Sequence, residues 1–308
     1  MVPRKIIIID DEKTQVEALT KTLQQTLSPQ YSLMKASSEK EIQGLINTKF
    51  FNLAILDIRM DDYECDGISL AERIIEINPY AKIIFVSRYI QEYLAKISPL
   101  LSAGNVLAVI EKKVDYDKWA QEMKPIIENY YHQLDEDPQV IQSALLEMYS
   151  KVKDEEDHLK KGYDFENFIS LLFQSMGYNE VIRNVKDKSG NETDLIIRNE
   201  IDDSFLSKFG KYLLIECKNR PEEHTNKNDY TLFLSKLEAS NGMADLGFII
   251  TTSTFTRTAY LEALRTSKGN KKIIFIDNPL ILSLIKAENP RKELKKIIDS
   301  QVKDNPLN

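Results

Sequence analysis

Charged side chains follow several of the apolar runs in the first half of the chain. Asp10 and Asp11 come directly after the first run, and Asp57 ends a later one. Ser87 and Lys112 each follow a further run. If these runs are strands of one doubly wound sheet, the five side chains lie at a single edge, where such sheets carry their chemistry. Three carboxylates at one edge repel one another unless a hard cation or a lysine compensates them.

The chemistry that suits such an edge is phosphoryl transfer to a carboxylate. Mg²⁺ takes carboxylate oxygens, keeps some of its waters and leaves room for a phosphoryl group. A carboxylate can accept that group, and a hydroxyl and an ammonium can then hold its oxygens. Taken singly, each residue has an ordinary explanation, since an Asp after a strand is often a helix cap. The conjunction at successive strand ends is more specific than any one part.

A second set of charged residues lies in the other half of the chain. Glu216 and Lys218 lie on one face of a predicted strand because side chains alternate, and Cys217 lies on the other. Asp194 on the neighbouring strand can join them, and Glu166 lies in the preceding helix. Two carboxylates suit Mg²⁺, and a lysine can orient an attacking water, as metal-assisted phosphodiester hydrolysis requires. The spacing alone is weak, because a charged edge strand gives the same pattern.

The first half of the chain alternates five apolar runs with amphipathic stretches. This order predicts a doubly wound, five-stranded parallel sheet with helices on both faces. The predicted strands are 5–9, 31–36, 52–57, 82–86 and 106–110, and the predicted helices are 12–27, 38–47, 67–77, 88–101 and 115–131.

The middle of the chain predicts a helical linker. Residues 132–138 are acidic and lack periodicity, so we expect a hinge there, and residues 139–159 predict a helix. Its apolar face either forms a dimer seam or packs on its own domain. The apolar positions are Val140, Ile141, Leu145, Leu146, Met148, Tyr149 and Val152.

The last part of the chain predicts a mixed α/β domain. The predicted order is a helix (165–176), three strands (180–185, 192–198, 211–218), a helix (227–242), a strand (247–251), a helix (256–265), a strand (272–276) and terminal helices. We therefore expect three regions, which are a domain at 1–133, a linker at 134–160 and a domain at 161–308.

The composition is that of a soluble globular protein of about two domains. The 308 residues are 42% hydrophobic and 29% charged, with two cysteines and no apolar run near the roughly 18 residues of a membrane span. We expect a cytoplasmic protein without membrane contact. The net charge of −7 argues against a generally basic nucleic-acid binder. It is uneven, since residues 1–160 carry 19 Lys and Arg against 27 Asp and Glu, and residues 161–308 carry 22 against 21.

Over residues 1–133 the sequence resembles the receiver domain of two-component response regulators. The matching residues are Asp10, Asp11, Asp57, Ser87 and Lys112. The resemblance implies that Asp57 accepts a phosphoryl group from a histidine kinase and that Asp10 and Asp11 hold Mg²⁺ beside it. It implies Ser87 as the switch hydroxyl and Lys112 as the cation that senses the phosphoryl group. The alternative is a receiver that works without phosphate, as a docking or dimer module.

Over residues 160–265 the sequence is similar to the Mrr-like branch of the PD-(D/E)xK restriction endonucleases. The similarity lies in Phe165–Phe168, Gly177-Tyr178, Asp194, Glu216–Lys218 and Gly247–Thr252. It implies a Mg²⁺-dependent DNA endonuclease with Asp194 and Glu216 as metal ligands, Lys218 as the catalytic lysine and Glu166 as an accessory acid. Nearby basic residues are candidate contacts to nucleic acid. These are Arg183, Lys186, Lys188 and Arg220, with Lys236, Arg257 and Arg265 as further candidates.

These features together predict a response-regulator effector. In it, phosphorylation of Asp57 controls a Mg²⁺-dependent endonuclease that acts on DNA as a homodimer once activated, and the architecture suggests a role in antiphage defence. The alternative is a DNA-binding response regulator whose nuclease fold does not cleave. The intact set of Asp194, Glu216 and Lys218 favours cleavage. RNA or branched DNA as the substrate, and the sign of control by phosphorylation, stay open.

Overall fold

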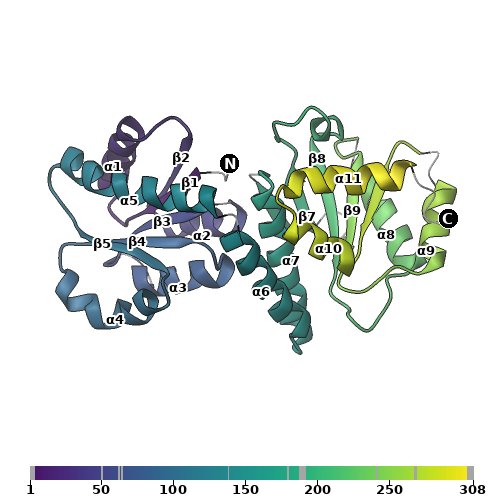
Figure 1. Cartoon of the computed structure of the whole chain (residues 1–308), viewed down its shortest axis with the longest axis horizontal. Helices are drawn as coiled ribbons and strands as arrows, with labels where there is room; N and C mark the ends of the chain where they lie inside the picture. Colours follow the sequence, from purple (N-terminus) through teal and green to yellow (C-terminus); the bar gives the residue numbers. More distant parts are fainter. Residues whose placement is uncertain are drawn as a thin grey trace. The chain divides into compact units, whose positions relative to one another are not determined.

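The computed structural model describes most of the chain, and Figure 1 shows its two parts. The described residues are 4–49, 51–61, 63, 65–137, 139–178, 180–186, 192–240, 242–266 and 269–303. The chain divides into two compact units, residues 1–144 and residues 145–308, and each is described by itself. The division falls inside the region predicted as the linker. Within the described residues, no helix is both long enough and apolar enough to cross a membrane.

The first unit is a five-stranded parallel sheet, as predicted. Its strand order is β2-β1-β3-β4-β5. Its elements are β1 (Arg4–Ile9), α1 (Lys13–Thr26), β2 (Tyr31–Ala36), α2 (Glu39–Thr48), β3 (Leu53–Asp57), α3 (Gly67–Ile77), β4 (Lys82–Ser87), α4 (Ile90–Ser102), β5 (Val106–Glu111) and α5 (Tyr116–Glu136).

Helices cover both faces of this sheet, which explains the run of four isoleucines in β1. Ile6 and Ile8 pack against α1 and α5 in one core cluster, which also holds Trp119. Ile7 and Ile9 belong to a second cluster, with side chains of α2, α3 and α4. In Figure 1, α5 lies on one side of the sheet and α3 and α4 lie on the other. A strand buried on both faces needs apolar residues at every position, so the continuous run is typical of a parallel sheet.

The predicted hinge at 132–138 is wrong, because α5 continues to Glu136. Leu134 is 3% exposed and extends the apolar face of α5 onto the core. Asp135 accepts a hydrogen bond from the Arg4 guanidinium on β1 at 2.6 Å. The acidic residues that suggested a loop thus belong to the last turns of a helix that is held by the first strand. Pro138 lies outside the described residues.

The linker region contains α6 (Gln139–Asp154), followed by α7 (His158–Ser175). The predicted helix at 139–159 is therefore too long, and α7 begins before the predicted residue 165. A new helix starts there because the Asp157 side chain accepts the backbone N–H groups of Leu159 and Lys160. The apolar face of α6 packs within the chain, since four of its residues are buried. These are Leu145, Met148, Tyr149 and Val152.

The second unit contains a mixed five-stranded sheet of order β10-β9-β8-β7-β6. β6, β7 and β8 are antiparallel, and β8, β9 and β10 are parallel. This confirms the predicted mixed α/β fold. The further elements are β6 (Val181–Lys186), β7 (Glu192–Arg198), a short 3₁₀ helix (Leu206–Lys208), β8 (Tyr212–Lys218), α8 (Lys227–Glu238), β9 (Leu246–Thr251), α9 (Arg257–Thr266), β10 (Lys272–Ile276), α10 (Asn278–Lys286) and α11 (Pro290–Lys303).

Different helices cover the two faces of this second sheet. On one face, the Phe173 ring of α7 lies 5.4 Å from the Phe248 ring of β9. On the other face, Leu214 of β8 packs with Phe233 of α8. Because side chains alternate along β8, Glu216 and Lys218 face the α8 side with Leu214, and Cys217 faces the α7 side. The face of each side chain decides which helix can supply further residues to the site.

Candidate functional site

The three aspartates of the first unit gather at one edge of its sheet. Asp10 follows β1 and Asp57 ends β3, its neighbour in the sheet. Asp10, Asp11 and Asp57 each offer a carboxylate oxygen, and these three oxygens lie within 4.8 Å of one another. Among the residues that the structure describes, no other group of three or more acidic, cysteine or histidine side chains is this close.

Lys112 compensates the two buried aspartates. Its Nζ donates to Asp10 Oδ2 and to Asp57 Oδ2, each at 2.6 Å, and its side chain is 6% exposed. Burial raises the pKa of Asp57 to about 6, although the hydrogen bond from Lys112 opposes this shift. Burial also raises the pKa of Asp10. Burial alone would lower the pKa of Lys112, but its bonds to the two carboxylates outweigh burial and raise it.

The donor set of this edge fits a hard divalent cation. It consists of carboxylates, and Lys112 takes only Oδ2 of Asp10 and Asp57. The other oxygens, Oδ1, accept backbone N–H groups of Glu12 and Arg59 at 2.9 and 3.3 Å, which fixes the directions of both carboxylates. Magnesium commonly binds through one or two carboxylates and retains waters, as this open edge allows.

Ser87 completes the edge from β4. It is 1% exposed, and its Oγ accepts the backbone N–H of Tyr89 at 3.1 Å. Its backbone carbonyl accepts the N–H of Lys112 at 3.1 Å, so these two residues are positioned together. The edge thus combines an acidic cluster, a hydroxyl and an ammonium, which is the equipment that phosphoryl transfer to a carboxylate requires.

In the second unit, Asp194 and Glu216 face each other across two strands. β7 and β8 pair Leu195 with Ile215, so the same register places Asp194 opposite Glu216. Asp194 Oδ2 accepts the backbone N–H of Cys217 at 2.7 Å. Its other oxygen, Oδ1, has no hydrogen bond within the described part of the chain. Burial and then the charge of Glu216 raise the pKa of Asp194 to about 6. Two carboxylates that repel at close range suit a divalent cation.

Glu216 is held by two lysines rather than one. Its Oε1 accepts a hydrogen bond from Lys218 Nζ and its Oε2 one from Lys236 Nζ, each at 2.7 Å. Lys218 comes from the same strand, whereas Lys236 comes from the last turn of α8. Burial alone would lower the pKa of Lys218. The charges of Glu216 and Asp194 act in the opposite direction and outweigh burial, so the pKa of Lys218 is raised. Lys218 therefore carries a positive charge at neutral pH.

Glu166 lies on a different side of the sheet from Glu216. It belongs to α7, which covers the face of Cys217. Burial, and then the charges of Asp194, Glu166 and Glu216, raise the pKa of the Cys217 thiol well above its ordinary value. A thiol that stays protonated is unreactive, as expected for a packing residue. The structure thus brings Asp194, Glu216 and Lys218 together, whereas Glu166 lies on the α7 side of the sheet.

The four predicted nucleic-acid contacts are in different settings. Arg183 donates a hydrogen bond to Asn167 Oδ1 at 2.5 Å, and burial lowers the pKa of Arg183. Its guanidinium is therefore held inside the unit. Lys186 is the last residue of β6. Lys188 lies outside the described residues. Arg220 is 43% exposed on its side chain and lies 3.6 Å from Asp229.

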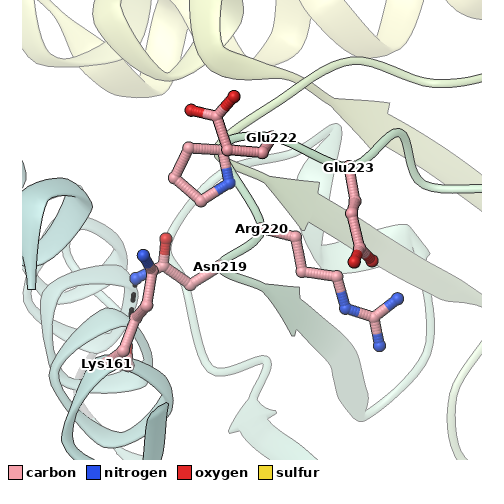
Figure 2. A pocket seen from close by; sticks show the side chains of 6 residues that line it. Lys161, Asn219, Arg220, Glu222 and Glu223 are labelled. Carbon is pink, nitrogen blue, oxygen red and sulfur yellow. Dashed lines mark hydrogen bonds between the residues drawn. The ribbon is translucent and has the colours of Figure 1, made fainter. Parts of the chain in front are cut away.

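Arg220 lines a pocket directly beyond the end of β8. The pocket has a volume of about 260 Å³. Figure 2 shows Lys161 and Asn219 on one side of it and Arg220 and Glu223 on the other. Its mixed charge, two cations against two glutamates, does not by itself select an anionic ligand. Asn219, which directly follows Lys218 in the chain, is among its lining residues, whereas Asp194, Glu216 and Lys218 are not.

Asn219 connects the end of β8 to two helices, which sequence reasoning missed. Its Nδ2 donates to the carbonyl oxygens of Val152 on α6 and Lys161 on α7, at 2.9 and 3.1 Å. Its Oδ1 accepts from the Thr252 hydroxyl at 3.0 Å. The amide therefore donates both of its N–H groups to the protein itself, and its oxygen accepts one hydrogen bond from the protein. A polar residue directly after Lys218 was the only available signal.

Comparison with known families assigns both units. Residues 6–124 match the response regulator receiver domain, and residues 159–285 match a restriction endonuclease domain of the Mrr type. No curated protein matches the chain. The chain is therefore a response regulator receiver domain fused to an Mrr-type restriction endonuclease domain.

Three solved structures illustrate what part of this chain is similar to. A CheY-like receiver domain protein from Methanospirillum hungatei is 24% identical, with 42% of this chain and 98% of that chain covered and a TM-score of 0.35. The response regulator protein TrrA from Thermotoga maritima, solved with Mg²⁺ and BeF, is 25% identical, with 40% and 98% covered and a TM-score of 0.33. A two-component transcriptional regulator from Clostridium phytofermentans is 26% identical, with 43% and 98% covered and a TM-score of 0.34.

Proposed function

We propose that this protein is a DNA endonuclease whose Mg²⁺-dependent activity is controlled by phosphorylation of Asp57. One observation carries the proposal: Asp194, Glu216 and Lys218 meet at the end of two paired strands in a domain of the restriction endonuclease family. A domain that only binds DNA has no need of a buried and a half-buried carboxylate that would face a phosphate. DNA is thus the expected substrate, with RNA or branched DNA as the variants to be tested.

In the nuclease centre, Asp194 and Glu216 would hold the cation and Lys218 would act on the water. A divalent cation bound there supplies a Lewis acid for the phosphodiester and lowers the pKa of a bound water. Lys218 is charged, and Glu216 fixes its Nζ at 2.7 Å. From this position the ammonium can donate to an attacking water or to a phosphate oxygen. Glu166, from α7, acts as an accessory acid in the proposal.

In the receiver, Asp57 would accept a phosphoryl group from a histidine kinase. Asp10 and Asp11 would hold Mg²⁺, and Ser87 and Lys112 would bind the phosphoryl oxygens. Lys112 already bridges Asp10 and Asp57 at 2.6 Å, so a phosphoryl group on Asp57 must draw it to a new partner. We propose that the activated form is a homodimer that serves in antiphage defence.

The linker helix offers a physical route for this control. α6 leads from the receiver, and its Val152 carbonyl accepts a hydrogen bond from Asn219, the residue directly after Lys218. Tyr149 of the same helix donates to Asn278 Oδ1 at 2.7 Å and packs its ring 5.0 Å from that of Phe168. A shift of α6 would therefore pull on the end of β8. This contact supports control of Lys218 through the linker.

The alternative function is a DNA-binding regulator whose nuclease fold does not cleave. One observation favours it, because both oxygens of Glu216 are already held by lysines. Under this alternative the cluster is a structural network of ion pairs that needs no cation.

Plasmid cleavage in the presence of Mg²⁺ separates these two functions. We expect the wild-type protein to nick or linearise plasmid DNA, and Lys218→Ala to bind DNA without cutting it. The matched control is Lys227→Ala, which removes a lysine on α8 that pairs with Glu262 at 3.1 Å, away from the site. Equal cutting by wild type and Lys218→Ala would contradict the site assignment. Binding without cutting in every form would establish the alternative.

A further inference from the structure

The nuclease centre contains one lysine more than its family resemblance supplies. Lys236 reaches Glu216 from α8, and its Nζ lies 2.7 Å from Oε2. Glu216 is buried, with a side chain only 9% exposed, and the Lys236 side chain is 19% exposed. A carboxylate in such a place must be compensated, because a buried charge without a partner is strongly unfavourable. Lys218 and Lys236 together provide that compensation.

The charges of the site balance before any cation enters. Asp194 and Glu216 carry two negative charges, and Lys218 and Lys236 carry two positive ones. Lys236 also acts on Asp194, since its charge is among those that lower the pKa of that carboxyl against the effect of burial. A divalent cation that binds Glu216 needs one of its two oxygens. It would then lie close to the ammonium groups of Lys218 and Lys236, whose positive charges oppose its binding.

Lys236 is the ammonium that can leave. Lys218 is tied to Glu216 by their common strand, two residues apart, so both side chains stay together on one face. Lys236 belongs to a separate helix, near the exposed end of that helix. Its side chain is flexible, with four methylene groups. It can turn to solvent or to an incoming phosphate without movement of the sheet.

We propose that Lys236 is a positioning residue that competes with the divalent cation for Glu216 Oε2. In the cation-free protein it holds the carboxylate in place, and cation binding displaces it. This inference rests on the proposed metal-dependent nuclease and adds a built-in competitor to its site. Removal of the competitor should strengthen cation binding.

The test is calorimetric titration of Mn²⁺ into the full-length protein without DNA. The receiver site is silenced in all samples by Asp10→Asn and Asp11→Asn, so the heat reports the nuclease centre. We expect Lys236→Met to bind Mn²⁺ about tenfold more tightly, which corresponds to about 1.4 kcal/mol. Lys236→Arg should restore weak binding, because it restores a positive charge. Lys227→Met, on the same helix, should match the parent protein.

The outcomes separate this inference from the proposed function. Unchanged or weaker Mn²⁺ binding by Lys236→Met, when the parent protein binds, overturns the competitor role and leaves the metal-dependent nuclease intact. No binding by the parent protein, nor by Lys236→Met, overturns both. The Mg²⁺ concentration for half-maximal plasmid cleavage should fall in Lys236→Met by the same factor as the Mn²⁺ dissociation constant.

Discussion

Removal of Lys112 should make the stability of the receiver depend on magnesium. Lys112 lies between two buried carboxylates, Asp10 and Asp57, at 2.6 Å from each. Lys112→Met keeps most of the side-chain volume and removes the charge. Without it, three carboxylates within 4.8 Å of one another have no cation among them. Mg²⁺ is then the remaining means of compensation.

The size of the effect follows from the burial of the ion pairs. Both side chains of each pair are 6% exposed, so solvent screens them little. Loss of one partner from a buried pair costs about 3–5 kcal/mol. In a unit of this size, 1 kcal/mol lowers the melting temperature by about 3–4 °C. We expect Lys112→Met to melt at least about 10 °C below wild type in EDTA.

The assay can follow the receiver alone in the full-length protein. The chain has a single tryptophan, Trp119, which is 1% exposed in the core of the receiver. Its fluorescence during heating therefore reports the first unit and not the second. The melting temperatures of wild type, Lys112→Met and Lys113→Met are measured once in EDTA and once in Mg²⁺. Lys113 is the control, because it is 40% exposed and pairs at the surface with Glu122, where pairs contribute little.

Two results decide the matter. We expect Mg²⁺ to raise the melting temperature of Lys112→Met much more than that of wild type, since cation binding stabilises the folded state by mass action. If Lys112→Met melts within about 2 °C of wild type in EDTA, or if Mg²⁺ shifts both equally, the compensation argument is refuted.

Three further predictions address other parts of the chain. Hydrogen bonds hold the pKa of Asp203 at about 2, below its ordinary 3.8. The contribution of Asp203 to the free energy of unfolding is therefore present above pH 4 and is lost as the pH falls through 2. Asp203→Asn should lower the free energy of unfolding by about 1 kcal/mol at pH 7, with a deficit that shrinks below pH 4 in circular dichroism melts. A Cβ at Gly67 would lie 1.9 Å from the Asp57 carbonyl oxygen, so Gly67→Ala should destabilise the receiver by about 3 kcal/mol by tryptophan fluorescence. Asn219→Ala loses two hydrogen bonds, one to α6 and one to α7. Its rate of plasmid cleavage should therefore no longer respond to beryllofluoride, a phosphoryl mimic at Asp57.

The acidic edge of the receiver could be predicted because its position depends on topology alone. Apolar runs such as β1 and β3 are visible in the sequence, and parallel strands bring their carboxyl ends to one edge. Asp10, Asp57 and Lys112 therefore had to lie near one another once the strands were identified. The pairing of Asp194 with Glu216 was predictable for a similar reason, since both strands alternate and share a register.

The parts that could not be predicted depend on contacts between distant segments. Nothing in the sequence of α8 indicates that Lys236 reaches Glu216 rather than solvent or a phosphate. The extension of α5 depends on Arg4, which is 131 residues away from Asp135 and fixes the last turns. The face covered by α7, and therefore the side of the sheet on which Glu166 lies, follows from helix packing and not from local pattern.

The central claim is that the state of Asp57 controls cleavage by the nuclease domain. The most direct measurement is the rate of plasmid cleavage with Mg²⁺, before and after treatment with beryllofluoride, a phosphoryl mimic, in wild type, Asp57→Ala and Lys218→Ala. We predict a rate that changes with the mimic in wild type, does not change in Asp57→Ala and is zero in Lys218→Ala. The direction of the change gives the sign of control. Cleavage by wild type at one rate in both states would contradict the claim.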